Sequence, residues 1–186
     1  MSKSLAVLIH ARQKSTRCPN KHLRPINDTG DNILDVALRN VRDLNNVEEK
    51  YLAAADEIMD RYIPGVQILH REYASVAPGN AHHSIMYKHL EKVKSDYICN
   101  YNPCQPFLDI KKLQAVIDWF KECKYDSAIT VAREKNFFWN NDLTPANFTA
   151  NDRLSTTSGP SLIKATHSLV FYKREYMLNN WELFSN

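Results

Sequence analysis

The sequence has 186 residues, of which 44% are hydrophobic and 24% charged, and its formal net charge is +3. This length and balance suit one globular domain with a buried core. The small positive excess does not by itself indicate binding to nucleic acid or to an anionic membrane. No apolar run approaches the roughly 20 residues that span a bilayer, and no export signal starts the sequence. The cysteines lack Cys-x-x-Cys spacing, which favours free thiols in a reducing compartment. We therefore expect a cytoplasmic protein without a membrane or nucleic-acid partner.

The first half of the chain alternates segments typical of strands and helices. An uninterrupted apolar run at 5–9 predicts a strand that is buried on both faces. Apolar residues at helical spacing predict a helix over about 31–44. Two short apolar runs predict strands at 51–55 and 66–69, with a turn at Pro64-Gly65 between them.

The second half continues this alternation. The further predicted elements are helices over 81–93 and 110–120 and strands at 97–101, 127–131 and 169–172. Asp109 stands where the N-cap of the second of these helices is expected. Residues 133–167 are richer in Asn, Thr, Ser and Pro, and we interpret them as a lid or dimerisation arm of the single domain 1–186.

Alternating strands and helices predict an α/β fold, here a Rossmann-like, mostly parallel sheet with helices on both faces. Ligands of such sheets bind at the carboxyl ends of the strands, near the point where the strand order reverses. We therefore expect the functional site in the loops that follow the strands at 5–10, 51–55 and 97–101.

The loop after the first strand is dense in positive charge. It carries the cations Arg12, Lys14, Arg17 and Lys21 beside the hydroxyl group of Ser15. Such cations, together with backbone N–H groups, can hold a triphosphate and stabilise the charge on a leaving pyrophosphate. A solvated basic loop is the alternative, but the position directly after a buried strand favours phosphate binding.

The same loop, Ala11-Arg-x-x-Ser15-x-Arg17-x-Pro19-x-Lys21, resembles the signature of the sugar-acid cytidylyltransferases. These are the acylneuraminate (CMP-sialic acid) synthetases, the KDO cytidylyltransferases and their relatives, and Ser15-Thr16-Arg17 is also close to a polysaccharide-biosynthesis branch. Further similarities follow in the family's order at Ala53–Asp56, Gln67–Arg71, Asn100–Leu108, Asp126–Val131 and Thr166–Glu175.

The resemblance implies a homodimeric enzyme that transfers CMP from CTP to a sugar acid or related acidic acceptor, with release of pyrophosphate. The acceptor hydroxyl attacks the α-phosphorus, and the protein contributes positioning and charge stabilisation. The implied catalytic residues are Arg12 and Lys21. The residues implied for nucleotide binding are Ala11, Arg12, Lys14, Ser15, Arg17, Lys21, Arg71 and Asn80. Those implied for the acceptor are Asn102, Gln105 and His167.

The resemblance also implies a magnesium ion, whose protein ligands the sequence does not identify. In one branch an Asp after the fourth strand is a ligand, and Cys104 stands there in this sequence, although thiolates suit Mg²⁺ poorly. Many relatives have another acidic site after the segment matched by 166–175, whereas this sequence ends at Asn186. The nearest acids are Asp56 and Asp109. A catalytically impaired homologue, acting as a nucleotide-binding or scaffold module, therefore stays open as the alternative.

Three other features have competing interpretations. The neighbouring His82 and His83 would point to different sides of a helix, which favours a phosphate or ribose contact over a metal site. Phe137–Trp139 could stack on a ligand, although an aromatic cluster more often belongs to a core or an interface. Cys104 could act as a nucleophile beside a histidine, although an unreactive thiol is the commoner state.

Overall fold

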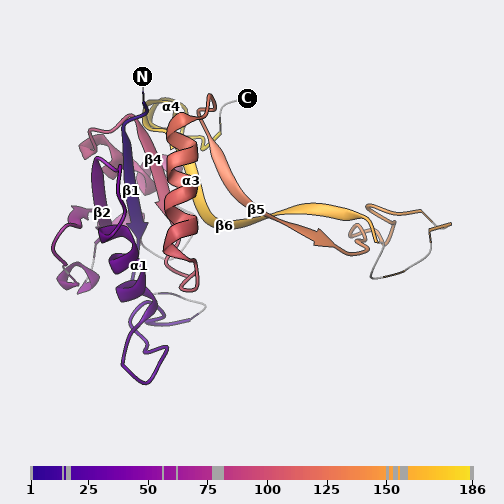
Figure 1. Cartoon of the computed structure of the whole chain (residues 1–186), viewed down its shortest axis with the longest axis horizontal. Helices are drawn as coiled ribbons and strands as arrows, with labels where there is room; N and C mark the ends of the chain where they lie inside the picture. The colour runs from indigo at the N-terminus through magenta and orange to yellow at the C-terminus, as the bar shows by residue number, and fades with distance from the viewer. Residues whose placement is uncertain are drawn as a thin grey trace. The chain divides into compact units, whose positions relative to one another are not determined.

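Six strands form one sheet in the part of the chain that the computed structural model describes, which is residues 2–13, 15, 18–55, 57–61, 63–76, 82–149, 151–152, 155 and 159–184. The strands are β1 (Leu5–His10), β2 (Glu49–Ala54), β3 (Gln67–His70), β4 (Tyr97–Tyr101), β5 (Ala128–Lys135) and β6 (Ser161–Lys173). They lie in the order β3-β2-β1-β4-β6-β5 (Figure 1). β1 pairs in parallel with both β2 and β4, and β2 with β3, while β4 and β6 are antiparallel. The expected α/β fold with a mostly parallel sheet is confirmed.

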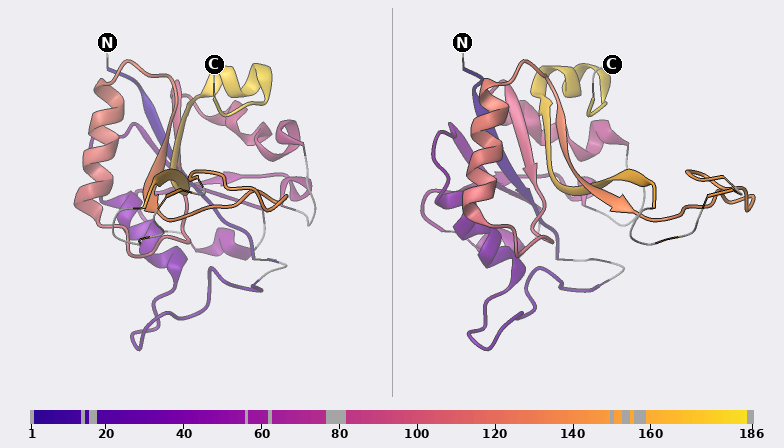
Figure 2. Two further views of the ribbon diagram at one scale, coloured as in Figure 1. Left: turned by 90° about the vertical axis from the view of Figure 1, so that its right-hand side faces the viewer. Right: turned by 45° about the vertical axis from the view of Figure 1, so that its right-hand side comes forward.

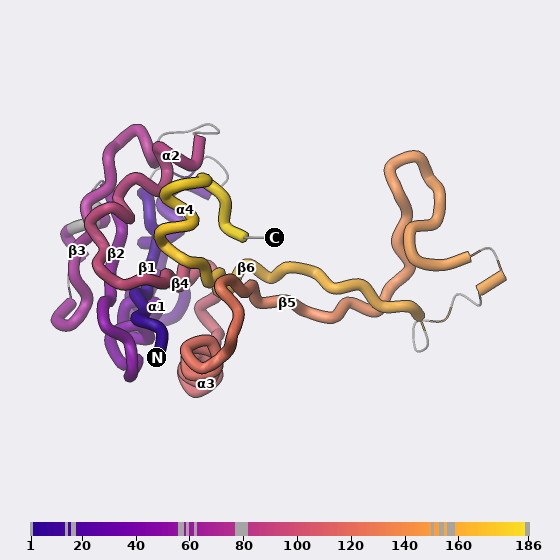
Figure 3. Tube along the Cα trace, turned by 90° about the horizontal axis from the view of Figure 1, so that it is seen from above, coloured from indigo at the N-terminus to yellow at the C-terminus, as the bar shows by residue number. Residues whose placement is uncertain are grey.

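Helices cover both faces of this sheet (Figure 2). The helices are α1 (Ile33–Arg42), α2 (His83–Met86), α3 (Ile110–Glu122) and α4 (Arg174–Asn180), with 3₁₀ turns η1 (Glu57–Asp60), η2 (Tyr73–Ser75) and η3 (Lys88–Lys92). Seen from above, α1 and α3 lie on one side of β1 and β4, and α2 and α4 lie on the other (Figure 3). Among the described residues, no helix combines the length and apolar character needed to cross a membrane.

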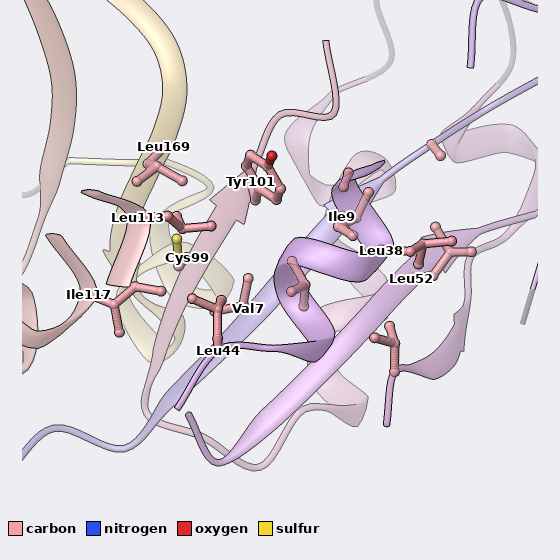
Figure 4. Packing of buried hydrophobic residues seen from close by; sticks show 14 of the residues in the cluster. Val7, Ile9, Leu38, Leu44, Leu52, Cys99, Tyr101, Leu113, Ile117 and Leu169 are labelled. Atoms are coloured by element: carbon pink, nitrogen blue, oxygen red, sulfur yellow. The ribbon is translucent and has the colours of Figure 1, made fainter. Parts of the chain in front are cut away.

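The side chains of β1 alternate between two hydrophobic clusters, one on each face. Leu5, Val7 and Ile9 join the cluster beneath α1 and α3, and its packing is shown in Figure 4. Ala6 and Leu8 join the cluster that contains Leu90 and Met177. Residues 5–9 are completely buried on both faces of the sheet, so this run of the strand is apolar without the alternation of a half-exposed strand.

Capping side chains set the starts of the two longer helices. Asp109 accepts hydrogen bonds from the N–H groups of Lys111 and Lys112 at the start of α3, which confirms the predicted N-cap. Asn32 caps α1 in the same way, so this helix covers Ile33–Arg42 within the predicted range 31–44.

The predicted helix over 81–93 is the main departure from expectation. Within its described residues the chain forms the single turn α2, breaks at Tyr87, and continues as η3. Weak helix formers are concentrated at His82–Ile85, whereas Met86, Lys88, Leu90 and Glu91 favour a helix in the second part of the segment. The break places the rings of Tyr87 and His89 against His10 at the end of β1.

The chain divides into two compact units. The first comprises residues 1–128 and 168–186, and the second residues 129–167. Within the second unit, β5 and β6 form a ribbon held by contacts such as Thr166 Oγ1 donating to the carbonyl of Thr130 at 3.1 Å. This unit nearly coincides with the segment 133–167 expected to be a lid or arm, and that role stays a prediction. In the same unit, Trp139 and Phe148 pack edge to face, consistent with an aromatic cluster of the core or interface type.

Candidate active site

A cleft of about 310 Å³ opens at the carboxyl ends of β1, β3 and β4 in the first unit. Five residues expected in the site line it together: Ala11, Arg12, Lys21, Arg71 and Asn102. The other lining residues are His10, His22, Ser75, Val76, Met86, Tyr87 and Cys104. The strand order reverses between β1 and β4, because the chain builds β2 and β3 on one side of β1 and then crosses to the other. The cleft thus lies where ligands bind in open α/β sheets.

Local hydrogen bonds hold Arg12 and Lys21 at this cleft. The guanidinium of Arg12 donates from Nη1 to the carbonyl of Val76 at 3.2 Å. Val76 belongs to the segment that follows β3. The loop then turns back on itself, since the N–H of Asn20 donates to the carbonyl of Gln13, and Asn20 takes a left-handed φ of 55°. This return brings Lys21 to the same cleft as Arg12.

Arg71 supplies a third cation, which is almost completely buried. Its N–H donates to the carbonyl of Ala54 and extends the pairing of β2 and β3 by one residue. Its Nη2 donates to the carbonyl of Ser75 at 3.0 Å, and only 7% of the residue is exposed. A guanidinium keeps its charge in such surroundings, so Arg71 gives the floor of the cleft a fixed positive charge.

One member of a histidine pair, His10, also lines the cleft. Nε2 of His10 lies 2.9 Å from Nε2 of His89, and the ring of Tyr87 stacks on His89. Burial, together with the charge of Arg71, lowers the pKa of His10 well below its usual value and that of His89 to about 3. Burial also raises the pKa of the Tyr87 hydroxyl. The pair is therefore neutral near pH 7.

On the β4 side, Asn102 shapes the turn and leaves its amide group to the cleft. The Asn102 carbonyl oxygen Oδ1 accepts from the N–H of Cys104 at 3.0 Å, and its backbone N–H donates to the carbonyl of Ser168. Because Oδ1 is used in the turn, the Nδ2 group is the part that can donate to a ligand. Gln105 follows in the same turn, and its backbone N–H donates to the carbonyl of Asn102. Gln105 is not among the residues that line the cleft.

Cys104 has a histidine partner that the sequence did not identify. Nδ1 of His22 lies 3.0 Å from the carbonyl oxygen of Arg12 and 3.4 Å from its backbone nitrogen, so it donates or accepts according to the tautomer. Nε2 of the same ring lies 4.0 Å from Sγ of Cys104. The two residues are 82 positions apart in the sequence, so only the fold brings them together. All of the cysteines are described, and all are free thiols.

Several predicted site residues are placed elsewhere or lie outside the description. Lys14, Arg17 and Asn80 fall outside the described residues, as does Asp56. Ser15 is buried, and its hydroxyl accepts from the N–H of Cys18. His167 belongs to the second unit, where its φ of 54° lies in the left-handed region. The roles predicted for these residues stay predictions.

His82 and His83 have local structural partners. His82 caps α2 by accepting from the N–H of Ser84 at 3.2 Å. Nδ1 of His83 lies 2.7 Å from the carbonyl of Trp181. Neither histidine is among the residues that line the cleft, so these positions give no support to a phosphate or ribose contact.

The donors that line the cleft do not form a magnesium site by themselves. The described lining residues include no carboxylate, and the Ser75 hydroxyl already donates to the carbonyl of Glu72. The histidines and Cys104 offer nitrogen and sulfur, whereas Mg²⁺ prefers oxygen. Within the described part of the chain, no three His, Cys, Asp or Glu side chains are grouped to hold a metal. The implied magnesium ion therefore stays a prediction.

A parallel α/β sheet with a cationic cleft at its switch point defines a nucleotide-binding domain of the Rossmann-like class. A model of the family described as cytidylyltransferase matches residues 6–177. The chain therefore belongs to the cytidylyltransferase family, which is a family of nucleotidyltransferases.

Solved structures support the fold. The structure of CMP:2-keto-3-deoxy-manno-octonic acid synthetase complexed with CTP matches 98% of this chain and 79% of its own, with a TM-score of 0.66 and 13% identity. The 4-diphosphocytidyl-2C-methyl-D-erythritol synthase of Anaerococcus prevotii matches 99% of this chain and 78% of its own, at TM-score 0.62 and 12% identity. The 2-C-methyl-D-erythritol 4-phosphate cytidylyltransferase of Francisella tularensis matches 95% and 75%, at TM-score 0.60 and 14% identity. Comparison of the sequence with curated proteins finds no match.

Proposed function

We propose that the protein transfers CMP from CTP to a small acidic acceptor, such as a sugar acid, and releases pyrophosphate. One observation carries this proposal: three cations, Arg12 and Lys21 from the loop after β1 and Arg71 from the end of β3, line one cleft at the carboxyl ends of parallel strands. Positive groups that converge in this way suit a polyphosphate, because charge-assisted hydrogen bonds to its oxygens are the strong ones. Membership of the cytidylyltransferase family makes CTP the nucleotide to test first.

The lining of the cleft suggests how the substrates would be arranged. Val76, Met86 and Tyr87 give the β3 side an apolar and aromatic wall, which suits a pyrimidine base. Asn102 on the β4 side presents amide donors, which suit the carboxylate or hydroxyl groups of an acceptor. The triphosphate would then lie between them, over the loop of Arg12 and Lys21.

In the proposed reaction, an acceptor hydroxyl attacks the α-phosphorus of CTP as the bond to the β-phosphate oxygen breaks. Negative charge grows on the departing pyrophosphate, and Arg12 and Lys21 stabilise it. Arg12 is held in advance by the carbonyl of Val76, so little reorganisation is needed. The chain's contribution is therefore positioning and electrostatics, as is usual for transfer of a phosphoryl-type group.

We further propose that the protein is a cytoplasmic homodimer that acts in polysaccharide biosynthesis. The ribbon of the second unit supports dimerisation, because Val131 and Ile163 expose large apolar side chains along it, with Ile163 65% exposed. A second copy of the chain would bury such residues.

The decisive experiment measures pyrophosphate release from CTP in the presence of Mg²⁺ and a panel of sugar acids and other acidic acceptors. We expect turnover with one acceptor class, and we expect Arg12→Ala to abolish it. Arg24→Ala is the matched control, because Arg24 is exposed and does not line the cleft. Absence of both turnover and CTP binding would contradict the proposal.

A second candidate is a nucleotide-binding module without catalysis. It is favoured by the described lining of the cleft, which contains no carboxylate for a metal. Calorimetry separates the two candidates: CTP binding that is the same with and without Mg²⁺, together with no turnover on any acceptor, supports the module and contradicts the enzyme.

A further inference from the structure

The histidine pair of the cleft is not used by the proposed reaction. His10 is the last residue of β1, and its neighbours Ile9 and Ala11 point into the cluster beneath α1 and α3. The side chain of His10 therefore faces the opposite side of the sheet, where Tyr87 and His89 lie. There the two Nε2 atoms of the pair are 2.9 Å apart, so one proton lies between the rings and they cannot both carry a proton on Nε2.

The charges that act most strongly on the pair are positive. Arg71, at the end of β3, acts on both histidines, and Lys92 of η3 acts on His89. Tyr87 stacks on His89 with ring centroids 6.3 Å apart. Tyr172 of β6 touches the ring of Tyr87 on its far side.

On the cleft side, the charged groups of the first loop are Arg12 and Lys21, and His22 completes that wall. The described residues that line the cleft include no negative charge. Glu72 and Glu91 line a separate pocket together with His89, and Glu72 is paired with Lys88 there. When no anion is bound in the cleft, burial and the nearby positive charges thus both disfavour the protonated form of the pair.

Phosphate groups in the cleft would reverse this local potential. His10 lines the same cleft as Arg12 and Lys21, and it directly precedes the Ala11-Arg12 segment. Because Nε2 of His10 is held by His89, Nδ1 is the ring nitrogen left for a ligand. A proton on the pair then gains an anionic partner, which favours the charged form.

We propose that the His10–His89 pair is a proton-coupled contact for polyphosphate. When phosphate groups occupy the cleft, the pair takes up one proton from solvent, and Nδ1–H of His10 donates to a phosphate oxygen. The proposal rests on the proposed function only in that the cleft binds a polyphosphate, and it needs neither cytosine nor turnover.

The test is calorimetry of inorganic tripolyphosphate binding to the full chain, from pH 5.5 to 8, in two buffers that differ in ionisation enthalpy. The difference in heat between buffers counts the protons taken up. Tripolyphosphate has its own ionisation, with the terminal pKa of such groups near about 6, so the wild type is compared with His10→Gln and His89→Gln at each pH. The difference between wild type and variants removes the ligand's own protons.

We expect the wild type to take up more protons than either variant, approaching one extra proton as the pH falls. Its affinity should then rise relative to the variants by up to about tenfold per pH unit, which is the limit for one coupled proton. His70→Gln should behave like the wild type, because His70 is exposed at the end of β3 and does not line the cleft.

Equal proton uptake in the wild type and the variants would overturn the proposal, as would failure of the wild type to bind tripolyphosphate. If neither variant folds, the net proton uptake by the wild type is corrected for the separately titrated ionisation of free tripolyphosphate at each pH, and a corrected uptake of zero across the range overturns the proposal. Failure of the proposed function has a different signature. Proton-coupled binding of tripolyphosphate without transfer from CTP would overturn the function and leave this inference standing.

Discussion

Acidification should destabilise the fold through the buried histidine pair. His89 is 4% exposed, and its pKa falls from the ordinary 6.5 to about 3 because of burial and Arg71. The unfolded chain keeps the ordinary pKa, so it binds the proton more readily over the whole interval. Stability is therefore complete above pH 6.5 and is lost as the pH falls towards 3.

The size of the effect follows from the width of that interval. One pKa unit corresponds to about 1.4 kcal/mol, so His89 alone should remove about 2 kcal/mol of unfolding free energy between pH 6.5 and pH 5. His10 acts in the same direction, because its pKa is also lowered well below the usual value. A loss of this size is a large part of the roughly 5–15 kcal/mol that stabilises a typical domain.

The assay is urea unfolding of the ligand-free protein at several pH values between 7 and 5. Carboxylates with lowered pKa values, such as Glu48 and Glu49, also lose their stabilising effect in acid, so the wild type alone is not decisive. His89→Gln removes the histidine term and should flatten the pH dependence by at least about 2 kcal/mol at pH 5. His70→Gln, at an exposed site, should not. Equal pH dependence in the wild type and in His89→Gln would refute the reasoning.

Four other substitutions or treatments test separate parts of the structure. Iodoacetamide should alkylate Cys104 in the free protein, and saturating CTP should slow the reaction, as peptide mass spectrometry can measure; an unprotected thiol would place the nucleotide elsewhere. Asn102→Asp keeps the turn acceptor but loses the amide donors, so the KM of an acidic acceptor should rise by about 10- to 100-fold while the CTP dissociation constant stays within about threefold. Phe120→Ala should cost about 3–5 kcal/mol in urea unfolding, since Phe120 is fully buried and stacks on Phe171 at 4.4 Å. Ile163→Asp should convert the proposed dimer to a monomer in light scattering, and an unchanged mass would exclude this face of the ribbon from the interface.

Elements with a one-dimensional signal were predictable from the sequence. Burial on both faces makes β1 apolar over residues 5–9, and the spacing of Leu113, Ile117 and Phe120 follows from the single buried face of α3. The segment over 81–93 was predicted wrongly as one helix, because its apolar spacing was clear while His82–Ile85 have weak helix propensity. At the break, the rings of Tyr87 and His89 pack against His10.

The candidate site was predictable where charge was concentrated and unpredictable where the fold supplies the partner. Arg12 and Lys21 stand together in one loop, so their common location in the cleft could be expected. His10 and His89 are 79 residues apart, and neither position has a local pattern that points to the other. The same holds for His22 and Cys104, for which the sequence suggested a histidine partner without identifying it.

Arg71 and the histidine pair differ in how they carry positive charge. Arg71 keeps its charge at any pH near neutrality, and burial makes that charge act strongly on its neighbours. The histidines next to it are neutral for the same reason, because they can release the proton that Arg71 cannot. The cleft therefore combines three fixed cations, Arg12, Lys21 and Arg71, with a histidine pair that we propose gains a proton when an anion binds. Such a site favours ligands with several adjacent negative charges.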